Sequence, residues 1–118
     1  MPIERGEVYI VDLVGAKSRE IYGHKDRPVV VVSADSINAK PLVIAVIPGT
    51  GTPPPALFPN VVAVRPSREN GLREETYFLC HQIRALDHSR FTKDRIGKLS
   101  DRDLLRIDNA VRFSLRLA

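Results

Sequence analysis

The hydrophobic positions of the first 85 residues follow the pattern of β-strands. In the first segment, β-branched and aromatic side chains alternate with other residues, as they do in a strand with two different faces. The second and third segments are almost continuously apolar, which is typical of strands buried on both faces. The predicted strands are Glu7–Leu13, Pro28–Ser33, Leu42–Ile47, Val61–Val64 and Thr76–Arg84.

The segments between these strands carry turn and loop signals. Residues 15–26 are polar and rich in basic side chains, so we expect an exposed loop there. Pro48 to Pro59 is rich in Gly, Thr and Pro and is predicted to leave the sheet directly after Ile47. Asn70-Gly71 favours a tight reversal, because both residue types tolerate positive φ.

The carboxyl-terminal segment changes to the period of a helix. Ser100 and Asp103 have the spacing of a capping box, with Asp in place of the usual Glu or Gln. The apolar stripe that follows is predicted to pack on the sheet, and it consists of Leu104, Ile107, Val111 and Leu115, widened by Leu105, Ala110 and Phe113. A helix is thus expected only at the end of a β-rich chain. The fold class is mainly β with α: one domain over residues 1–118, a small, strongly bent β-barrel capped by the terminal helix.

Composition narrows the class of protein. The 118 residues include 18 Lys and Arg against 14 Asp and Glu, and the net charge of +4 weakly favours a polyanionic partner such as nucleic acid. The single cysteine, Cys80, cannot form an internal disulfide and fits a reducing compartment. No apolar signal core or membrane-length apolar run occurs, so we expect a cytoplasmic protein without a membrane partner.

Several common catalytic motifs are absent from the sequence. It contains no Walker loop, GxGxxG, HExxH or Cys and His pairs at zinc-site spacing, so neither a metal nor another cofactor is expected. Cys80 and His81 are neighbours on a predicted strand and would point to opposite faces, which argues against a nucleophile–base pair. Cys80 is therefore predicted to be a small core residue.

Isolated polar residues at strand ends are the better candidates for chemistry. Arg27 opens the second strand, Thr50 follows the third, and His81 lies near the end of the last. A cation, a hydroxyl and an imidazole could form a metal-free phosphodiester site, since RNA supplies its own nucleophile in the 2′-hydroxyl. Such a reaction needs a general base, a general acid and a cation for the charge developing on the phosphoryl oxygens.

The order of short motifs along the chain resembles the MazF/PemK (Kid) toxin family. Each motif is short, but together they run over nearly the whole chain in the family's order. The matching segments are Arg5–Tyr9, Arg27–Ser33, Val46–Thr50, Gly71–Leu72, His81–Phe91 and Ile96–Leu99, followed by the terminal helix.

This resemblance implies a bacterial toxin of a type II toxin–antitoxin system. Family members are typically homodimeric, metal-independent endoribonucleases with a CcdB-like barrel. They cut single-stranded RNA at short sequences and leave a 2′,3′-cyclic phosphate and a 5′-hydroxyl. The family's catalytic arginine falls on Arg27 and its threonine on Thr50. A cognate antitoxin with a disordered acidic segment is the implied protein partner.

Further residues are expected to bind RNA or to move protons. The predicted RNA-binding residues are Lys17, Arg19, His24, Lys25, Gly49, Gln82 and Arg84. His81 is a candidate for acid–base catalysis, since histidine ordinarily titrates near pH 6.5. Simple alternation would bury it beside Leu79 and Ile83, whereas a bulge would expose it. The sequence leaves open whether His81 or His24 is catalytic, and it suggests Tyr22 as a base-stacking residue.

Two other functions remain as alternatives. A CcdB-like toxin that poisons DNA gyrase would need neither Arg27 nor Thr50, but this chain lacks the Trp-Gly-Ile ending that CcdB uses. A non-catalytic nucleic-acid-binding barrel is compatible with the charge alone.

Overall fold

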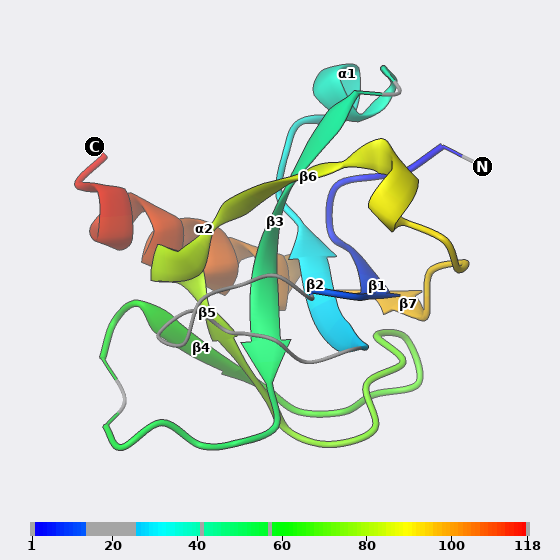
Figure 1. The fold of residues 1–118 in the computed structure, drawn as a ribbon. Coiled ribbons are helices and arrows are strands. Elements are labelled where there is room, and N and C mark those ends of the chain that lie inside the picture. Colours follow the sequence, from blue (N-terminus) through cyan, green and yellow to red (C-terminus); the bar gives the residue numbers. More distant parts are fainter. Residues whose placement is uncertain (1, 14–25, 41, 57, 118) are drawn as a thin grey trace.

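A computed structural model describes residues 2–13, 26–40, 42–56 and 58–117 of the chain (Figure 1). Within these ranges the fold is mainly β, with one long helix at the carboxyl end. The strands are β1 (Glu7–Val11), β2 (Arg27–Val31), β3 (Val43–Thr50), β4 (Val61–Val64), β5 (Thr76–Leu79), β6 (Arg84–Asp87) and β7 (Gly97–Lys98). The α-helices are α1 (Asp35–Asn38) and α2 (Asp101–Leu115), and Cys80–Gln82 and His88–Arg90 form single 3₁₀ turns.

The strands form one antiparallel sheet with β3 at its centre. Their order is β4-β5-β3-β2-β1-β7, and β6 pairs with the first half of β3 while β5 pairs with its end. The sheet curls strongly around β3 (Figure 1), and no pairing joins β4 to β7 in the described part of the chain. The result is an open half-barrel with a carboxyl-terminal helix, which confirms the predicted fold class.

Apolar residues bury both faces of the central strands. On one face, strand residues pack against α2 in a core that consists of Val8, Val30, Ile47, Val62, Val64, Leu72, Phe78, Cys80, Leu99, Ile107 and Ala110. On the other face a second core consists of Ile3, Tyr9, Val11, Leu13, Val29, Val31, Ile44, Val46 and Leu86. This arrangement explains the unbroken apolar run of β2, whose successive side chains alternate between the two cores.

Helix α2 begins as the sequence predicts. The Ser100 hydroxyl accepts a hydrogen bond from the Asp103 backbone N–H at 3.1 Å, which satisfies one free donor of the first turn. Fewer residues of α2 are buried than the predicted apolar stripe contains. Ile107 and Ala110 are buried and Leu104 and Val111 are half-buried, whereas the sides of the helix that turn away from the sheet expose Leu105, Phe113 and Leu115.

Three local predictions were wrong. Strand β3 continues through Pro48 to Thr50 instead of ending at Ile47. Pro48 lies where the partner of β3 changes from β6 to β5, a place where a missing backbone donor is more easily tolerated. The expected strand Thr76–Arg84 is interrupted by the turn Cys80–Gln82. A four-residue helix, α1, also forms before β3, although the only helix predicted was at the carboxyl end.

The predicted reversal at residues 70 and 71 is confirmed. The Asn70 side chain accepts hydrogen bonds from the backbone N–H groups of Ser67 and Leu72, at 3.0 and 2.9 Å. Gly71 alone of the pair has positive φ, at 70°. A Cβ at this position would lie 2.0 Å from the backbone oxygen of Ile96, so only glycine fits.

Candidate functional site

Arg27 and Thr50 lie across from each other at the ends of two paired strands. The antiparallel register pairs Val29 with Pro48 and Val30 with Ile47. Continued by two residues, the same register sets Arg27 opposite Thr50, on the same face of the sheet. Neighbouring strands are only about 5 Å apart, so the structure brings these two predicted residues together.

The guanidinium of Arg27 is available to a ligand. Its Nε is buried and has no hydrogen-bond partner, and no carboxylate of the described residues forms an ion pair with Arg27. The preceding residue, Asp26, pairs instead with Lys93 at 3.5 Å. Buried donors in proteins are almost always satisfied, so an unpaired arginine N–H favours an anion supplied from outside.

The hydroxyl of Thr50 is held in a defined position. Its Oγ1 accepts a hydrogen bond from the Thr52 backbone N–H at 3.1 Å. Because a hydroxyl both accepts and donates, the Thr50 proton remains free to reach an anion beside Arg27. A cation and a hydroxyl donor therefore converge at the ends of β2 and β3.

Arg84 adds a second buried donor on the same face. It lies directly opposite Val46 on β3, and Thr50 is four residues further along that strand, roughly 13 Å away. The Nη1 atom of Arg84 is buried without a hydrogen-bond partner. Two arginines with unsatisfied donors on one face suit a chain of phosphates better than a single small anion.

A pocket that Arg27 helps to line opens where β1, β2 and β5 have their ends. It has a volume of about 480 Å³, with Ile10, Pro28 and Leu72 among its apolar lining residues. The Glu74 carboxylate, which also lines it, lies so close to Gly51 that a Cβ there would be 2.2 Å from Oε2. Thr50, His81 and Arg84 are not among the lining residues, so this pocket adjoins the Arg27–Thr50 pair without enclosing it.

His81 lies at the surface, contrary to the burial that simple alternation predicts. Four residues of β3, from Val46 to Gly49, face seven on the partner segment, from Arg84 back to Phe78, and the turn Cys80–Gln82 takes up the three extra residues. This turn is the bulge that the sequence analysis allowed for. The structure shows no strand pairing that brings His81 to Arg27, so its catalytic role stays a prediction.

Asn60 holds the His81 ring. The distance between Asn60 Nδ2 and His81 Nδ1 is 2.6 Å. An amide nitrogen donates, so Nδ1 of His81 is the acceptor in this orientation of the Asn60 amide. Gln82, in the same turn, is half-buried and has an interaction partner of its own, and its role in RNA binding stays a prediction. Sequence reasoning did not foresee Asn60, which comes from the loop before β4.

Gly49 has a structural reason within the fold. A Cβ there would lie 2.6 Å from Thr76 Cγ2 and 3.0 Å from the Phe78 ring. Close packing of β5 on β3 therefore requires glycine, and the predicted contact of Gly49 with RNA is not needed to explain this residue.

Apart from Asp26, the predicted basic loop at residues 15–26 lies outside the described residues. This applies to the RNA-binding candidates Lys17, Arg19, His24 and Lys25, and to Tyr22.

Cys80 is a core residue, as predicted. Its side chain is fully buried, and burial raises the pKa of its thiol to about 12. A thiol with such a pKa is not a nucleophile near neutral pH.

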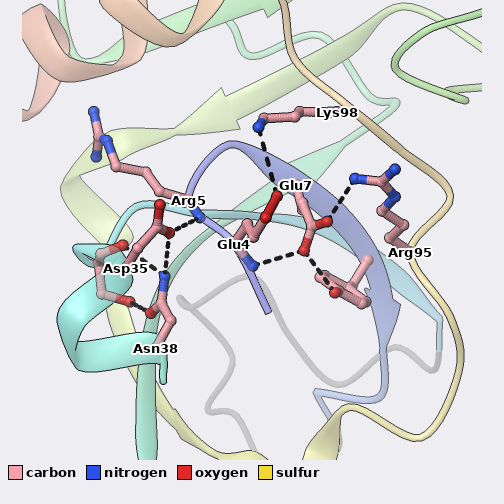
Figure 2. Close-up of polar contacts among 9 residues, drawn as sticks. Glu4, Arg5, Glu7, Asp35, Asn38, Arg95 and Lys98 are labelled. Carbon is pink, nitrogen blue, oxygen red and sulfur yellow. Dashed lines mark hydrogen bonds and ion pairs between the residues drawn. The ribbon is translucent and has the colours of Figure 1, made fainter. Parts of the chain in front are cut away.

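The Arg5-Gly6-Glu7 motif builds a polar network at the start of β1 (Figure 2). The buried Glu7 carboxylate accepts hydrogen bonds from the Glu4 backbone N–H at 2.7 Å and from Tyr9 Oη at 2.8 Å, and it pairs with Arg95 at 2.6 Å. The Arg5 backbone N–H donates to Asp35 Oδ1, while the Arg5 side chain forms an ion pair with Asp108 of α2. The network joins β1 to α1, α2 and the segment before β7.

Two features of the described residues concern metals and membranes. No group of three or more His, Cys, Asp or Glu side chains within them is arranged to hold a metal ion. None of their helices has both the length and the apolar character needed to cross a lipid bilayer.

Comparison with known proteins gives a consistent family. The model of the PemK-like, MazF-like toxin of type II toxin–antitoxin systems matches residues 4–115. Endoribonuclease MazF of Staphylococcus saprophyticus is 33% identical over 115 residues, covering 98% of this chain and 92% of that protein.

Solved structures share the fold. An endoribonuclease in complex with its cognate antitoxin from a mycobacterial species has a TM-score of 0.78 at 24% identity, covering 98% of this chain and 97% of that one. MazF from Deinococcus radiodurans has a TM-score of 0.79 at 17% identity, covering 98% of each chain. The chain therefore belongs to the PemK/MazF toxin family of type II toxin–antitoxin systems and is a homologue of endoribonuclease MazF.

Proposed function

We propose that this protein is a toxin that cleaves single-stranded RNA at short sequences without a metal ion. The observation that carries the proposal is the register of β2 and β3. Continued to the strand ends, it sets the Arg27 guanidinium, which has an unsatisfied buried donor, opposite the Thr50 hydroxyl. The family of the chain and the MazF endoribonuclease that it matches support the same activity.

The reaction would use the 2′-hydroxyl of the RNA as its nucleophile. The 2′-oxygen attacks phosphorus and loses its proton to a general base, while the P–O5′ bond breaks and the 5′-oxygen gains a proton from a general acid. The products are a 2′,3′-cyclic phosphate and a 5′-hydroxyl. Arg27 and Thr50 would donate hydrogen bonds to the non-bridging oxygens, where negative charge develops. His81 and His24 remain the candidates for proton transfer.

The expected partners follow from the same proposal. Arg84 would hold a further phosphate of the RNA, together with the basic residues between β1 and β2. An antitoxin would inhibit the protein by covering Arg27, and structural relatives have been crystallised with their antitoxins. We also propose that the toxin acts as a homodimer in the cytoplasm.

The decisive experiment is cleavage of a mixed-sequence single-stranded RNA in the presence of EDTA. Arg27→Ala and Thr50→Ala should each lower the rate by about 10²–10³-fold, the usual cost of losing a donor to a developing oxyanion. Arg112→Ala, which removes the same charge from α2, should leave the rate unchanged. A 2′-deoxy nucleotide at the cleaved position should block the reaction, and the product ends should carry a cyclic phosphate.

Cleavage that survives both changes would contradict the proposed site. No cleavage by the wild-type protein would contradict the proposed function. RNA binding without cleavage would then indicate the non-catalytic barrel, and inhibition of DNA gyrase would indicate the CcdB-like alternative.

A further inference from the structure

An aromatic side chain that the sequence analysis did not single out lies beside the candidate site. Tyr77 on β5 pairs directly with Thr50 on β3. Residues opposite each other in an antiparallel pair have Cβ atoms about 5 Å apart and point to the same face of the sheet. The register of β2 and β3, continued by two residues, sets Arg27 opposite Thr50 on the other side of β3, so Tyr77, Thr50 and Arg27 form a row across three adjacent strands.

The ring of Tyr77 is not used by the core. The Tyr77 side chain is half-buried and belongs to neither apolar core. By contrast, Phe78 lies in the core that contains Ile107, and Leu79 packs against the other core. Among the described residues, the recorded aromatic ring contact joins Tyr9 and Phe91 and does not involve Tyr77. A partly exposed tyrosine without a recorded aromatic partner, in the same row as two donors suited to a phosphate, can offer its ring to a ring of the ligand.

A hydrogen bond restrains the ring from its polar end. Tyr77 Oη donates to Glu75 Oε1 at 3.0 Å, from the residue two positions earlier on the same face. This hydrogen bond is the main cause that raises the pKa of the Tyr77 phenol above its usual value, so the ring stays neutral at physiological pH. A neutral ring held at one end does not repel RNA and loses little side-chain entropy when a base packs against it.

We propose that Tyr77 is a base-stacking residue for a nucleotide flanking the phosphate bound by Arg27 and Thr50. The inference rests on the proposed function, because it takes the cleaved phosphate as the fixed point. Single-stranded RNA exposes its bases, and proteins commonly bind them by stacking on tyrosine or phenylalanine. Every base has a π-face, so Tyr77 contributes affinity and orientation to the site rather than the choice of base.

The test is a double-mutant cycle between Tyr77 and the RNA. The ligand is an oligonucleotide of the mapped cleavage sequence with a 2′-deoxy nucleotide at the cleaved position, so that it binds without being cut. It is compared with versions that lack the base on either side of that phosphate. With wild-type protein, removing the stacked base should weaken binding about 5- to 150-fold, which corresponds to the ~1–3 kcal/mol of one base–aromatic stack.

The variants isolate the ring. Tyr77→Ala should bind the intact RNA as weakly as wild-type protein binds the RNA lacking the base, and base removal should then cost no more than about twofold. Tyr77→Phe should keep nearly all of the wild-type affinity, because it keeps the ring. Phe113→Ala, which removes an exposed ring from α2, should not change the cycle. A fluorescent 2-aminopurine at the stacked position should be quenched by wild-type protein and by Tyr77→Phe only.

Each outcome has a distinct meaning. An equal loss from base removal in wild-type protein and in a folded Tyr77→Ala variant, with RNA cleavage intact, would overturn the role of Tyr77 alone. A Tyr77→Phe variant that binds RNA as weakly as Tyr77→Ala would also overturn it, because the hydroxyl and not the ring would then be required. If the wild-type protein cut no RNA, the proposed function would fall and the stacking role with it.

Discussion

The buried carboxylate of Glu7 gives a quantitative test of how the first strand is held. Its side chain is 4% exposed, whereas that of its partner Arg95 is 45% exposed. We consider Glu7→Gln and Arg95→Gln, made singly and together, and the change that each causes in the free energy of unfolding. Both substitutions keep most of the side-chain volume, so the loss of charge and of hydrogen bonds dominates.

The magnitude follows from the contacts of the carboxylate. Glu7 accepts two neutral hydrogen bonds, from Glu4 and Tyr9, and one charge-assisted bond from Arg95. Hydrogen bonds to charged groups contribute about 1.5–3 kcal/mol. Glu7→Gln should therefore lower the free energy of unfolding by about 2–3 kcal/mol, since an amide N–H₂ would face another donor. Arg95→Gln should cost about 1–2 kcal/mol, and the coupling between the two changes should be about 1.5 kcal/mol.

The assay is urea-induced unfolding followed by circular dichroism, with the same cycle made for Glu4 and Lys98 as a control. That pair is 3.8 Å apart, and both side chains are 48% exposed, so its coupling should stay below about 0.5 kcal/mol. Most of the Glu7–Arg95 coupling should also persist in 0.5 M NaCl, because the Glu7 carboxylate is buried and salt screens a pair with a buried member less than an exposed pair. The reasoning is refuted if the two couplings are equal or if salt removes both.

Three further predictions concern stability and reactivity. Gly49→Ala should destabilise the protein by about 1–3 kcal/mol, because the new methyl group would push the buried Phe78 away from β3, and thermal unfolding would report this. Cys80 should react with a thiol reagent only after denaturation, since burial raises its pKa to about 12, and fast labelling of native protein would contradict this. The Ser89 backbone N–H lowers the pKa of Asp87, so Asp87 stabilises the fold above the unfolded-state pKa of about 3.9, and this is lost as pH falls through its lower folded value. Acid unfolding should thus depend less on pH below about 4 in Asp87→Asn.

The sequence pattern predicts the parts of the fold that depend on local periodicity. The fully apolar run at 29–31 and the capped helix after Ser100 form as expected, because burial on two faces and an N-cap each leave a local signal. The exposure of Leu105 and Phe113 could not be predicted in this way. It depends on how much of α2 the curled sheet reaches, and that is a property of packing between distant segments.

The candidate site shows the same division. Arg27 and Thr50 were found from short motifs, yet only the register of β2 and β3 sets them opposite each other. Arg84 was chosen for its charge, whereas its buried, unsatisfied donor appears only in three dimensions. Tyr77 was missed because a tyrosine in a strand is ordinary in sequence. Its pairing with Thr50 joins two residues that lie 27 positions apart along the chain, so no local pattern shows it.

The turn at Cys80–Gln82 explains why alternation failed and links the fold to the site. A period of two assigns His81 to a buried face, because it assumes that one strand runs from Thr76 to Arg84. With three extra residues in the turn, β5 and β6 pair with successive parts of the same strand, β3. The pairing of β5 directs Tyr77 to Thr50, and that of β6 places Arg84 on the same face. A deletion that removes these three residues should therefore disrupt the arrangement of Tyr77, Thr50 and Arg84, the side chains proposed to bind RNA, even where β3 itself still forms.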